Sequence, residues 1–494
     1  MKKFLAILLI SLLLASGLSF ALSNKPIEGR AKNVIVLIGD GMGISQVYIT
    51  KLCYGHLAME DFPYSGYEMT NSLSGEVTDS AAAGTAIATG FKTYNKIISQ
   101  VKNNGKYYNV TTLLELAKKL DKATGLVTTT RITHATPAVF GAHVENRDME
   151  KEIAKQYLEK KINVLLGGGK EEFSNELLEK YKEEGYEIVY NKDQLEKANS
   201  KYLLGLFSDS HIPYVLDRNE DVPSLLDMTK KAIEILEKNP NGFFLMVEGG
   251  RIDHACHGND IASVVAETKE FDDVVRYCLN YAKKRGDTLV IVLADHETGG
   301  LGLGLNYGDS IDEDKILNIK ASAYRMAKLI KEGADPKTVL KTYANIELNK
   351  DELQKIDEAL KSTNKYALSN TIAEIIDERV GVKFISHKHT AVPVPLLAYG
   401  PGAEDFMGFH HHVDTSKLVA KDMLFRGDYA VSIKGITHVK GDANGDFKVD
   451  KEDAYITLLY YVGNFANTDQ EKLLDMDNNG VIDYNDVYLI LEQS

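Results

Sequence analysis

Apolar positions along this chain fall into two kinds of segment that alternate with each other. Short, near-continuous apolar runs are separated by longer stretches in which apolar residues recur with helical spacing. Continuous apolar runs are typical of strands buried on both faces of a sheet, and their alternation with helices is typical of βαβ units. The sequence therefore predicts an α/β fold with a mainly parallel sheet. The expected strands are 33–38, 125–129, 163–166, 242–247, 288–293 and 394–399, and the expected helices include 111–120, 150–160, 224–238 and 260–284.

The pattern changes between Gly300 and Phe384. The apolar runs stop there, and charged helical segments such as 321–331 and 351–360 replace them. We expect residues 300–384 to form a helical subdomain inserted into the α/β domain. Two interpretations stay open: the insertion covers an active site or mediates dimer contacts, or it is a solvated decoration.

The N-terminus has the order of features found in a secretory leader. Two lysines follow Met1, residues 4–18 are an uncharged apolar run, and Ser19-Phe20-Ala21 is a small-x-small cleavage pattern. This order predicts a signal peptide over 1–21 and a secreted, periplasmic or cell-surface protein. A short membrane anchor is less favoured because the run is shorter than the roughly 20 residues that a span requires. We expect no transmembrane span after cleavage.

Composition and charge narrow the class of protein. The 494 residues are 44% hydrophobic, which is enough for a globular core, and the formal net charge is −14. A nucleic-acid-binding role is not expected, because such binding rests on lysine and arginine neutralising phosphates. The three cysteines do not provide a disulfide framework.

One serine stands at the expected start of a small-residue helix. The segment 77–85 leaves Ser80 directly before helical residues 81–88. The N-terminal end of a helix presents unpaired N–H groups and the positive end of its dipole, which favour a bound phosphate or a developing serine alkoxide. The alternative is that Asp79 and Ser80 form an ordinary helix cap.

Metal-type side chains follow several of the expected strands. An open parallel sheet builds its sites outside the carboxyl ends of its strands. A single carboxylate there is often a helix cap, but a set that combines carboxylates and imidazoles favours a metal site. The set is Asp40 after strand 33–38; Glu248, Asp253 and His257 after strand 242–247; Asp295 and His296 after strand 288–293; and His389 before strand 394–399.

The chemistry of this set points to catalysis. Aspartate and histidine ligands without cysteine suit a catalytic zinc site. There are enough ligands for more than one metal, and two metals roughly 4 Å apart form a recurring clamp for in-line phosphoryl displacement. Ser80 would supply the nucleophile for such a site.

Two similar acidic loops follow a change of composition near Lys440. Each places side-chain oxygens at loop positions 1, 3, 5, 9 and 12, the pattern with which a loop surrounds Ca²⁺, and each precedes an apolar helical segment. We expect residues 437–494 to form a small all-α domain that binds two calcium ions. The predicted ligands are Asp442, Asn444, Asp446, Asp450 and Asp453 in the first loop, and Asp475, Asp477, Asn479, Asp483 and Asp486 in the second.

Several segments together resemble the signatures of the alkaline phosphatase family. Residues 77–85 are similar to its nucleophile signature and 38–43 to its first metal-binding turn. The further similar segments, in family order, are 128–137, 146–148, 247–254, 294–297 and 389–390. The resemblance implies a three-layer sandwich around the sheet, here over 22–436. It also implies a homodimeric enzyme that hydrolyses phosphate monoesters through a phosphoserine intermediate, with two zinc ions and one magnesium ion.

The resemblance also implies roles for individual residues. Ser80 would be the nucleophile, and Arg147 would bind two non-bridging phosphate oxygens with its planar guanidinium. The implied metal ligands fall into three sets. They are Asp253, His257 and His389 for the first zinc; Asp40, Asp295 and His296 for the second zinc; and Asp40, Thr136 and Glu248 for magnesium.

Two positions depart from the best-known bacterial pattern of this family. His134 stands where that pattern has an aspartate, and His254 where it has a lysine, although both histidines occur in other branches. An imidazole near the third site would shift its metal preference and the affinity for phosphate. We therefore expect His134 and His254 to contribute to substrate binding.

The tail resembles a dockerin domain, the duplicated calcium-loop module that binds cohesin domains. Aspartate at position 12 of each loop fits that module, whereas Phe447 stands at a position where glycine is usual. The resemblance implies a cohesin-bearing partner. Helix 454–461, with Tyr455, Tyr460 and Tyr461, is a candidate partner face, and packing within the module is the alternative.

Two other functions stay open. Relatives in the same metalloenzyme superfamily include phosphodiesterases and phosphomutases, which often keep the metal ligands and change the nucleophile or the phosphate clamp. Ser80 together with Arg147 favours monoester hydrolysis. A non-catalytic cell-surface interaction protein is less favoured, because every expected ligand is present.

Overall fold

The structure is a computed structural model that describes residues 31–103, 105–304, 306–424, 440–443, 449–461 and 471–493. The expected signal peptide over 1–21 lies outside these residues. So do the predicted calcium ligands Asn444 and Asp446 and the boundary predicted after residue 436.

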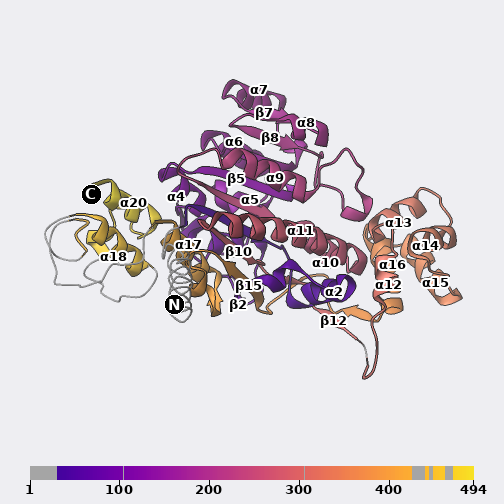
Figure 1. The fold of residues 1–494 in the computed structure, drawn as a ribbon. Coiled ribbons are helices and arrows are strands. Elements are labelled where there is room, and N and C mark those ends of the chain that lie inside the picture. The colour runs from indigo at the N-terminus through magenta and orange to yellow at the C-terminus, as the bar shows by residue number, and fades with distance from the viewer. Residues whose placement is uncertain are drawn as a thin grey trace, which may run out of the picture.

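A ten-stranded sheet forms the centre of the molecule (Figure 1). Its strands are β1 (Asn33–Ile38), β2 (Tyr64–Met69), β5 (Ala123–Arg131), β6 (Val164–Gly168), β7 (Glu187–Val189), β8 (Leu203–Leu206), β9 (Phe243–Glu248), β10 (Thr288–Leu293), β15 (Val394–Tyr399) and β16 (Gly408–His411). Their order across the sheet is β16-β2-β15-β10-β1-β9-β5-β6-β8-β7. All neighbouring pairs are parallel except the two that involve β15, so the prediction of a mainly parallel α/β sheet is confirmed.

The direction of β15 follows from the path of the chain. After β10, the short strand β11 (Glu297–Thr298) pairs with β14 (His389–Thr390), so the chain returns beside the carboxyl end of β10. From there it can re-enter the sheet only by running back along β10. Residues 394–399 were predicted as a strand from their apolar run, and this return path makes the strand antiparallel.

Helices cover both faces of the sheet, because its strands are apolar on both sides. In β1, Ile35 and Leu37 belong to one apolar core, while Val34, Val36 and Ile38 belong to the other. The first core includes α2 (Ile44–Tyr54), α8 (Lys192–Lys197), α9 (Leu225–Leu236), α10 (Arg251–His257) and α11 (Ile261–Arg285). The second includes α3 (Ser80–Thr89), α4 (Leu113–Lys119), α5 (Ala135–Gly141), α6 (Glu150–Glu159), α7 (Asn175–Glu183) and α17 (His412–Leu424). The result is a three-layer arrangement.

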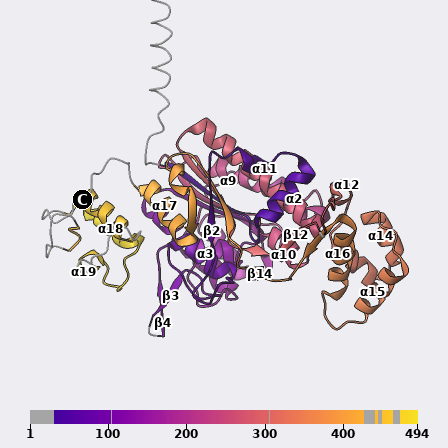
Figure 2. The same cartoon turned by 90° about the horizontal axis from the view of Figure 1, so that it is seen from below.

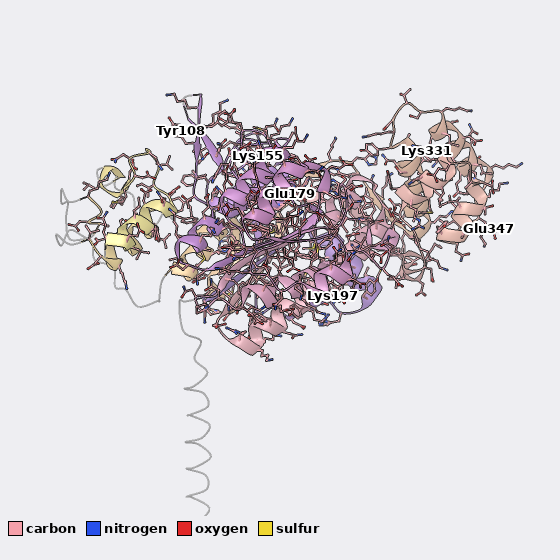
Figure 3. The ribbon with its side chains drawn as sticks, turned by 90° about the horizontal axis from the view of Figure 1, so that it is seen from above. Tyr108, Lys155, Glu179, Lys197, Lys331 and Glu347 are labelled. Atoms are coloured by element: carbon pink, nitrogen blue, oxygen red, sulfur yellow. The ribbon has the colours of Figure 1, made fainter. Side chains whose placement is uncertain are left out.

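A helical unit stands at one end of the molecule, where Figure 3 labels Lys331 and Glu347. It consists of α12 (Glu313–Leu317), α13 (Ala323–Lys331), α14 (Pro336–Ala344), α15 (Lys350–Leu360) and α16 (Ala367–Val380). Strands β12 (Leu301–Leu303) and β13 (Val382–Phe384) pair at its base. Its apolar residues are continuous with the core around α11.

The C-terminal helices lie at the opposite end (Figures 1 and 2). These are α18 (Lys451–Tyr461), α19 (Glu471–Leu474) and α20 (Tyr484–Gln493). α18 packs on α20, and α20 packs on α4. Leu458, Tyr461 and Tyr484 join the same apolar core as α3 and α4.

The remaining elements are short. Strands β3 (Gln100–Asn103) and β4 (Lys106–Asn109) form a projecting hairpin that carries Tyr108 (Figures 2 and 3). The 3-10 helices are Ala58–Asp61, Lys170–Glu172, Val215–Asp217 and Ala403–Phe406. Of the helices that the structure describes, none is both long enough and apolar enough to cross a lipid bilayer.

Candidate active site

The predicted site residues converge at the carboxyl edge of the central strands. In the register of the sheet, Ile38 at the end of β1 lies beside Leu293 of β10 and Glu248 of β9. Asp40 and Asp295, which follow these strands, therefore meet. Gly41 permits the close approach, because its φ is +73° and a Cβ there would lie 2.8 Å from the Cα of Asp253.

Ser80 is the first residue of α3 and is 2% exposed. Its Oγ lies 3.2 Å from Nε2 of His296. Asp79 is the N-cap, since its Oδ1 accepts a hydrogen bond of 3.0 Å from the backbone N–H of Ala82. The cap and the candidate nucleophile are thus different residues, which leaves the Ser80 hydroxyl free to face the metal-type side chains.

One group of donor atoms gathers around Asp253. Its carboxylate, one nitrogen of His296 and one of His389 all lie within 4.8 Å of one another. His257 is one helical turn from Asp253 on α10, and its Nε2 is 3.3 Å from Asp253 Oδ2 and 3.2 Å from His389 Nε2. The structure therefore brings together the residues expected around the first zinc, with His296 bordering the group.

A second group lies next to Ser80. Donor atoms of Asp40, Asp295 and His296 are within 4.8 Å of one another. His296 Nε2 is 3.2 Å from Asp295 Oδ2 and 3.6 Å from Asp40 Oδ1. These are the three residues expected around the second zinc.

A third group shares Asp40 with the second. Donor atoms of Asp40, His134 and Glu248 lie within 4.8 Å of one another. Thr136 donates a hydrogen bond of 3.4 Å from Oγ1 to Asp40 Oδ2. The structure thus places the expected ligands Asp40, Thr136 and Glu248 together, with His134 among them.

Arg147 is held beside Ser80 by Asp79. Its Nη1 donates to Asp79 Oδ2 at 3.2 Å, and its Nη2 lies 3.0 Å from Nε2 of His134. The side chain of Arg147 is 19% exposed, so the guanidinium is restrained yet accessible. This places a planar cation next to the nucleophile, where a phosphate would need it.

His254 lies behind this cation, in a cluster of aromatic rings. Its ring centroid is 4.4 Å from that of His211 and 5.7 Å from that of His134. Burial lowers the pKa of His254 and of His134, and nearby arginines lower both further. Both imidazoles are therefore neutral at physiological pH.

Comparison with known proteins agrees with this geometry. The family model described as alkaline phosphatase matches residues 31–424. Alkaline phosphatase 4 of Bacillus subtilis is 40% identical over 420 residues, which cover 81% of this chain and 90% of the relative. The chain belongs to the alkaline phosphatase family. It is accordingly a phosphoric monoester hydrolase.

Two solved alkaline phosphatases illustrate the shared fold. The cold-active enzyme of the psychrophile Shewanella sp. superposes with a TM-score of 0.74 at 32% identity, over 79% of this chain and 99% of that one. The enzyme of the Antarctic bacterium TAB5 superposes with a TM-score of 0.61 at 29% identity, over 80% and 98%.

The family implies a zinc and magnesium site, and the donor groups of this alkaline phosphatase fit one. Asp40 Oδ1, Glu248 Oε1, Asp295 Oδ2 and His134 Nδ1 are buried without a hydrogen-bond partner. Burial raises the pKa of Asp40, and the charges of Asp295, Asp253 and Glu248 raise it further. Burial also raises the pKa of Glu248 to about 7. Divalent cations would satisfy these atoms and offset the repulsion between the carboxylates.

Several supporting residues of this alkaline phosphatase were not found by sequence analysis. Thr298 donates from Oγ1 to Asp253 Oδ1 at 2.6 Å and lies 3.2 Å from His296 Nδ1. Thr128 and Thr130 donate to Glu248 Oε2. The run Thr128-Thr129-Thr130 at the end of an apolar strand could have indicated the contacts with Glu248. No comparable signal marked Thr298.

A buried ion pair also supports the site from the sheet side. His412 Nδ1 lies 3.0 Å from Glu68 Oε2, and its Nε2 lies 2.9 Å from the backbone oxygen of Asp295. The charge of Glu68 raises the pKa of His412 against the effect of burial. The pair joins residues 344 positions apart, so no local pattern of residues indicates it.

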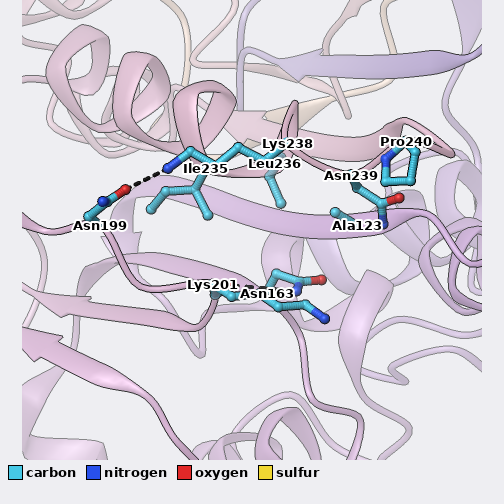
Figure 4. A pocket seen from close by; sticks show the side chains of 9 residues that line it. All are labelled: Ala123, Asn163, Asn199, Lys201, Ile235, Leu236, Lys238, Asn239 and Pro240. Atoms are coloured by element: carbon cyan, nitrogen blue, oxygen red, sulfur yellow. Dashed lines mark hydrogen bonds between the residues drawn. The ribbon is translucent and has the colours of Figure 1, made fainter.

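A hollow at the opposite edge of the sheet has none of these features. Figure 4 shows it between Ala123, Asn163, Lys238 and Pro240, with Lys238 bonded to Asn199. It lies at the amino ends of the strands, away from the carboxyl edge where sites of open parallel sheets form. The group around Ser80 therefore stays the candidate active site.

The second acidic loop of the C-terminal region is partly assembled. Carboxylate oxygens of Asp475, Asp477 and Asp486 lie within 4.8 Å of one another. Asp483 is directed elsewhere, because its oxygens accept hydrogen bonds from the backbone N–H groups of Thr111 and Asn485. In the first loop, Asp453 accepts from the N–H groups of Ala443 and Asp450.

Proposed function

We propose that this alkaline phosphatase hydrolyses phosphate monoesters through a phosphoserine at Ser80. The observation that carries the proposal is the position of the Ser80 hydroxyl at the start of α3, 3.2 Å from His296 and next to two groups of metal-type donors. The start of a helix favours the anionic substrate. Burial of Ser80 keeps competing water away from the nucleophile.

Different residues of the protein bind the substrate and attack it. Arg147 binds two non-bridging oxygens, and Asp79 keeps the guanidinium in place for them. Ser80 Oγ then forms a bond to phosphorus as the bond to the leaving alcohol breaks, and the proton lost by Ser80 balances the one gained by the alcohol. Water next cleaves the phosphoserine and releases inorganic phosphate.

We propose the three metal sets that the family resemblance implies. Asp253, His257 and His389 would hold one zinc, Asp40, Asp295 and His296 the other, and Asp40, Thr136 and Glu248 a magnesium ion. Bound metals would act as Lewis acids that stabilise negative charge on the reacting oxygens.

His134 and His254 belong to the same proposal as substrate-binding residues. His134 lies within hydrogen-bond distance of Arg147 and next to Asp40 and Glu248. Variants of the TAB5 enzyme in which one histidine is replaced by glutamate or aspartate are described with Mg bound in the M3 site. A histidine near the third site is thus a position at which the metal of this enzyme can be altered.

The test compares an aryl phosphate monoester with the matching diester. We expect the monoester to be hydrolysed faster, chelation to abolish turnover, and zinc with magnesium to restore it. Ser80→Ala should lower kcat by at least about 10³-fold, because it removes the nucleophile. Full turnover by this variant would overturn the covalent mechanism, and faster diester cleavage would favour the phosphodiesterase alternative.

For the C-terminal region we propose a dockerin-like module that binds two calcium ions. Support comes from the clustered oxygens of Asp475, Asp477 and Asp486. A cohesin-bearing protein is the proposed partner. Tyr461 is a poor candidate for its docking face, since its hydroxyl donates to the backbone oxygen of Thr89 and its ring lies 5.2 Å from that of Phe91. Binding of an isolated cohesin domain, measured by calorimetry with and without calcium, tests this part.

We further propose that the enzyme is exported after loss of residues 1–21 and forms a homodimer. The apolar run after Lys2 and Lys3 supports export. Light scattering of the purified protein tests the dimer, and a mass near that of one 54.7 kDa chain would refute it.

A further inference from the structure

A cavity of about 800 Å³ opens beside the metal-type residues, between α10 and the helical unit. His257, an expected zinc ligand, forms part of its wall. Tyr324 of α13 and Tyr366, which precedes α16, line it from the other side. The cavity is therefore continuous with the candidate active site.

A row of histidine rings separates the cavity from Ser80. Ser80 contacts His296, whose ring stacks on that of His389 with 3.5 Å between centroids. The ring of His257 follows at 5.0 Å from that of His389, and the cavity begins behind it. In an in-line displacement the leaving group departs opposite the nucleophile. The leaving alcohol would thus point toward this cavity.

Arg251 presents an unpaired cation to the cavity. Its guanidinium lies 3.9 Å above the ring of Tyr214, and its Nη1 is 2.8 Å from Nδ1 of His254. Its Nε is buried without a hydrogen-bond partner. Over the described part of the chain, no ion pair joins Arg251 to a carboxylate, whereas Arg131 is paired with Glu150.

The carboxylate in the cavity wall does not neutralise this cation. Asp260 also lines the cavity, but its oxygens accept hydrogen bonds from Ser263 and from the backbone N–H of Ala323. Lys388, next to the expected ligand His389, adds a second cation to the lining. Within the described residues it too forms no ion pair. The lining is therefore cationic, with tyrosine rings that are 59% exposed at Tyr324 and 50% exposed at Tyr366.

We propose that this cavity binds the leaving alcohol of the substrate and that Arg251 binds a second anionic group on it. The group is a carboxylate or a second phosphate, either of which fits the fork of a guanidinium. The enzyme then prefers monoesters whose alcohol carries a second anionic group to monoesters of a neutral alcohol. This inference rests on the proposed monoester hydrolysis at Ser80.

The test uses three substrates whose leaving alcohols have similar reactivity. Glycerol 3-phosphate has a neutral alcohol, 3-phosphoglycerate carries a carboxylate, and glycerol 1,3-bisphosphate carries a second phosphate. We divide kcat/KM for each anionic substrate by kcat/KM for glycerol 3-phosphate, using the metal-loaded enzyme. Arg251→Met should lower this ratio by about tenfold, because it removes a charged hydrogen bond. Lys337→Met, a change at an exposed lysine in another hollow of the helical unit, should leave the ratio unaltered.

Binding provides a second measurement that does not need turnover. Dissociation constants are measured by calorimetry in the Ser80→Ala background. Adding Arg251→Met should raise the constant for 3-phosphoglycerate or for the bisphosphate about tenfold more than it raises the constant for glycerol 3-phosphate. If Arg251→Met changes the ratio of dissociation constants, anionic substrate to glycerol 3-phosphate, for only one of the two anionic substrates, that substrate carries the group that Arg251 binds.

The results separate this inference from the proposed function. If Arg251→Met weakens all three substrates equally, Arg251 acts through His254 alone and the inference is wrong. If the unaltered enzyme hydrolyses none of them with its metals bound, the proposed function itself fails.

Discussion

At the scale of single residues, Asp79 joins Ser80, the proposed nucleophile, to Arg147, the proposed phosphate-binding cation. One of its oxygens caps α3, and the other accepts from Arg147 and from the backbone N–H of Lys96. The sequence offered helix capping and catalysis as alternatives for the Asp79-Ser80 pair. The structure assigns capping to Asp79, whereas the hydroxyl of Ser80, the first helical residue, lies 3.2 Å from Nε2 of His296.

Thr298 provides a prediction at this scale. It bonds Asp253 and lies beside His296, so it positions residues of both expected zinc groups. We expect Thr298→Val, which keeps the shape and removes the hydroxyl, to weaken zinc binding by about 10–100-fold. Competition against a chromogenic chelator measures this loss. Thr363→Val, at an exposed position, is the control, and equal zinc affinity in both variants would contradict the prediction.

At the scale of elements, the sequence was most informative where an apolar run lies entirely inside the sheet. Strands β1, β10 and β15 begin and end at the residues that the apolar pattern predicted, because strands with both faces covered consist almost entirely of apolar residues. Strand β2, the second strand from one edge of the sheet, was missed because its glycine and its exposed side chains break the apolar pattern. The antiparallel direction of β15 was set by the pairing of β11 with β14, which apolar periodicity does not encode.

Asp422 in α17 gives a pH-dependent prediction for this element. Burial raises the pKa of its carboxyl to about 8, and the charges of Asp405 and Glu404 contribute. Gly402, with φ of +78°, is packed so closely that a Cβ there would lie 2.2 Å from this carboxylate. The protonated form is therefore favoured in the folded protein, and its stabilising contribution is lost as the pH rises from about 4 through 8.

Replacing this carboxyl removes the pH dependence. We expect Asp422→Asn to gain thermal stability relative to the parent as the pH rises, by roughly 2–4 °C at pH 9 and by little at pH 4. Calorimetric melting curves at both values measure the difference. If Asp422→Asn changes the melting temperature by the same amount at both pH values, burial of the charge is not the cause of the change.

At the scale of the whole molecule, the two added units sit at opposite ends of the α/β domain (Figure 1). The helical unit contributes Tyr324 and Tyr366 to the cavity beside the candidate active site. The C-terminal unit packs against α3, α4 and α17, where the hydroxyls of Ser416 and Tyr484 are 2.9 Å apart. It stays a prediction that residues 300–384 form an inserted subdomain and that residues 437–494 form a separate domain.

Through this packing, the proposed calcium binding would stabilise the whole chain. Asp483 and Tyr484, which contact Thr111 and Ser416, lie within three residues of the clustered Asp486. We expect calcium at about 100 times its dissociation constant to stabilise the zinc-loaded protein by about 2.7 kcal/mol for each site that it fills. Thermal melting with added calcium measures the effect.

Two variants make the calcium measurement specific. Asp477→Asn should reduce the shift in melting temperature, because it removes one of the clustered carboxylates. Asp357→Asn, at an exposed position of α15, should not. An unchanged melting temperature at millimolar calcium would refute calcium binding by this unit.

The sequence by itself determined the fold class and the residue types of the active site. Buried parallel strands need continuous apolar runs, and metal chemistry needs carboxylates and imidazoles at their carboxyl ends, so both leave a local pattern. Only the tertiary structure decided which groups share donors, which residues support them and where the cavity lies. Thr298 on Asp253, Glu68 on His412 and Arg251 above Tyr214 are contacts between distant segments, and no local pattern of residues records such contacts.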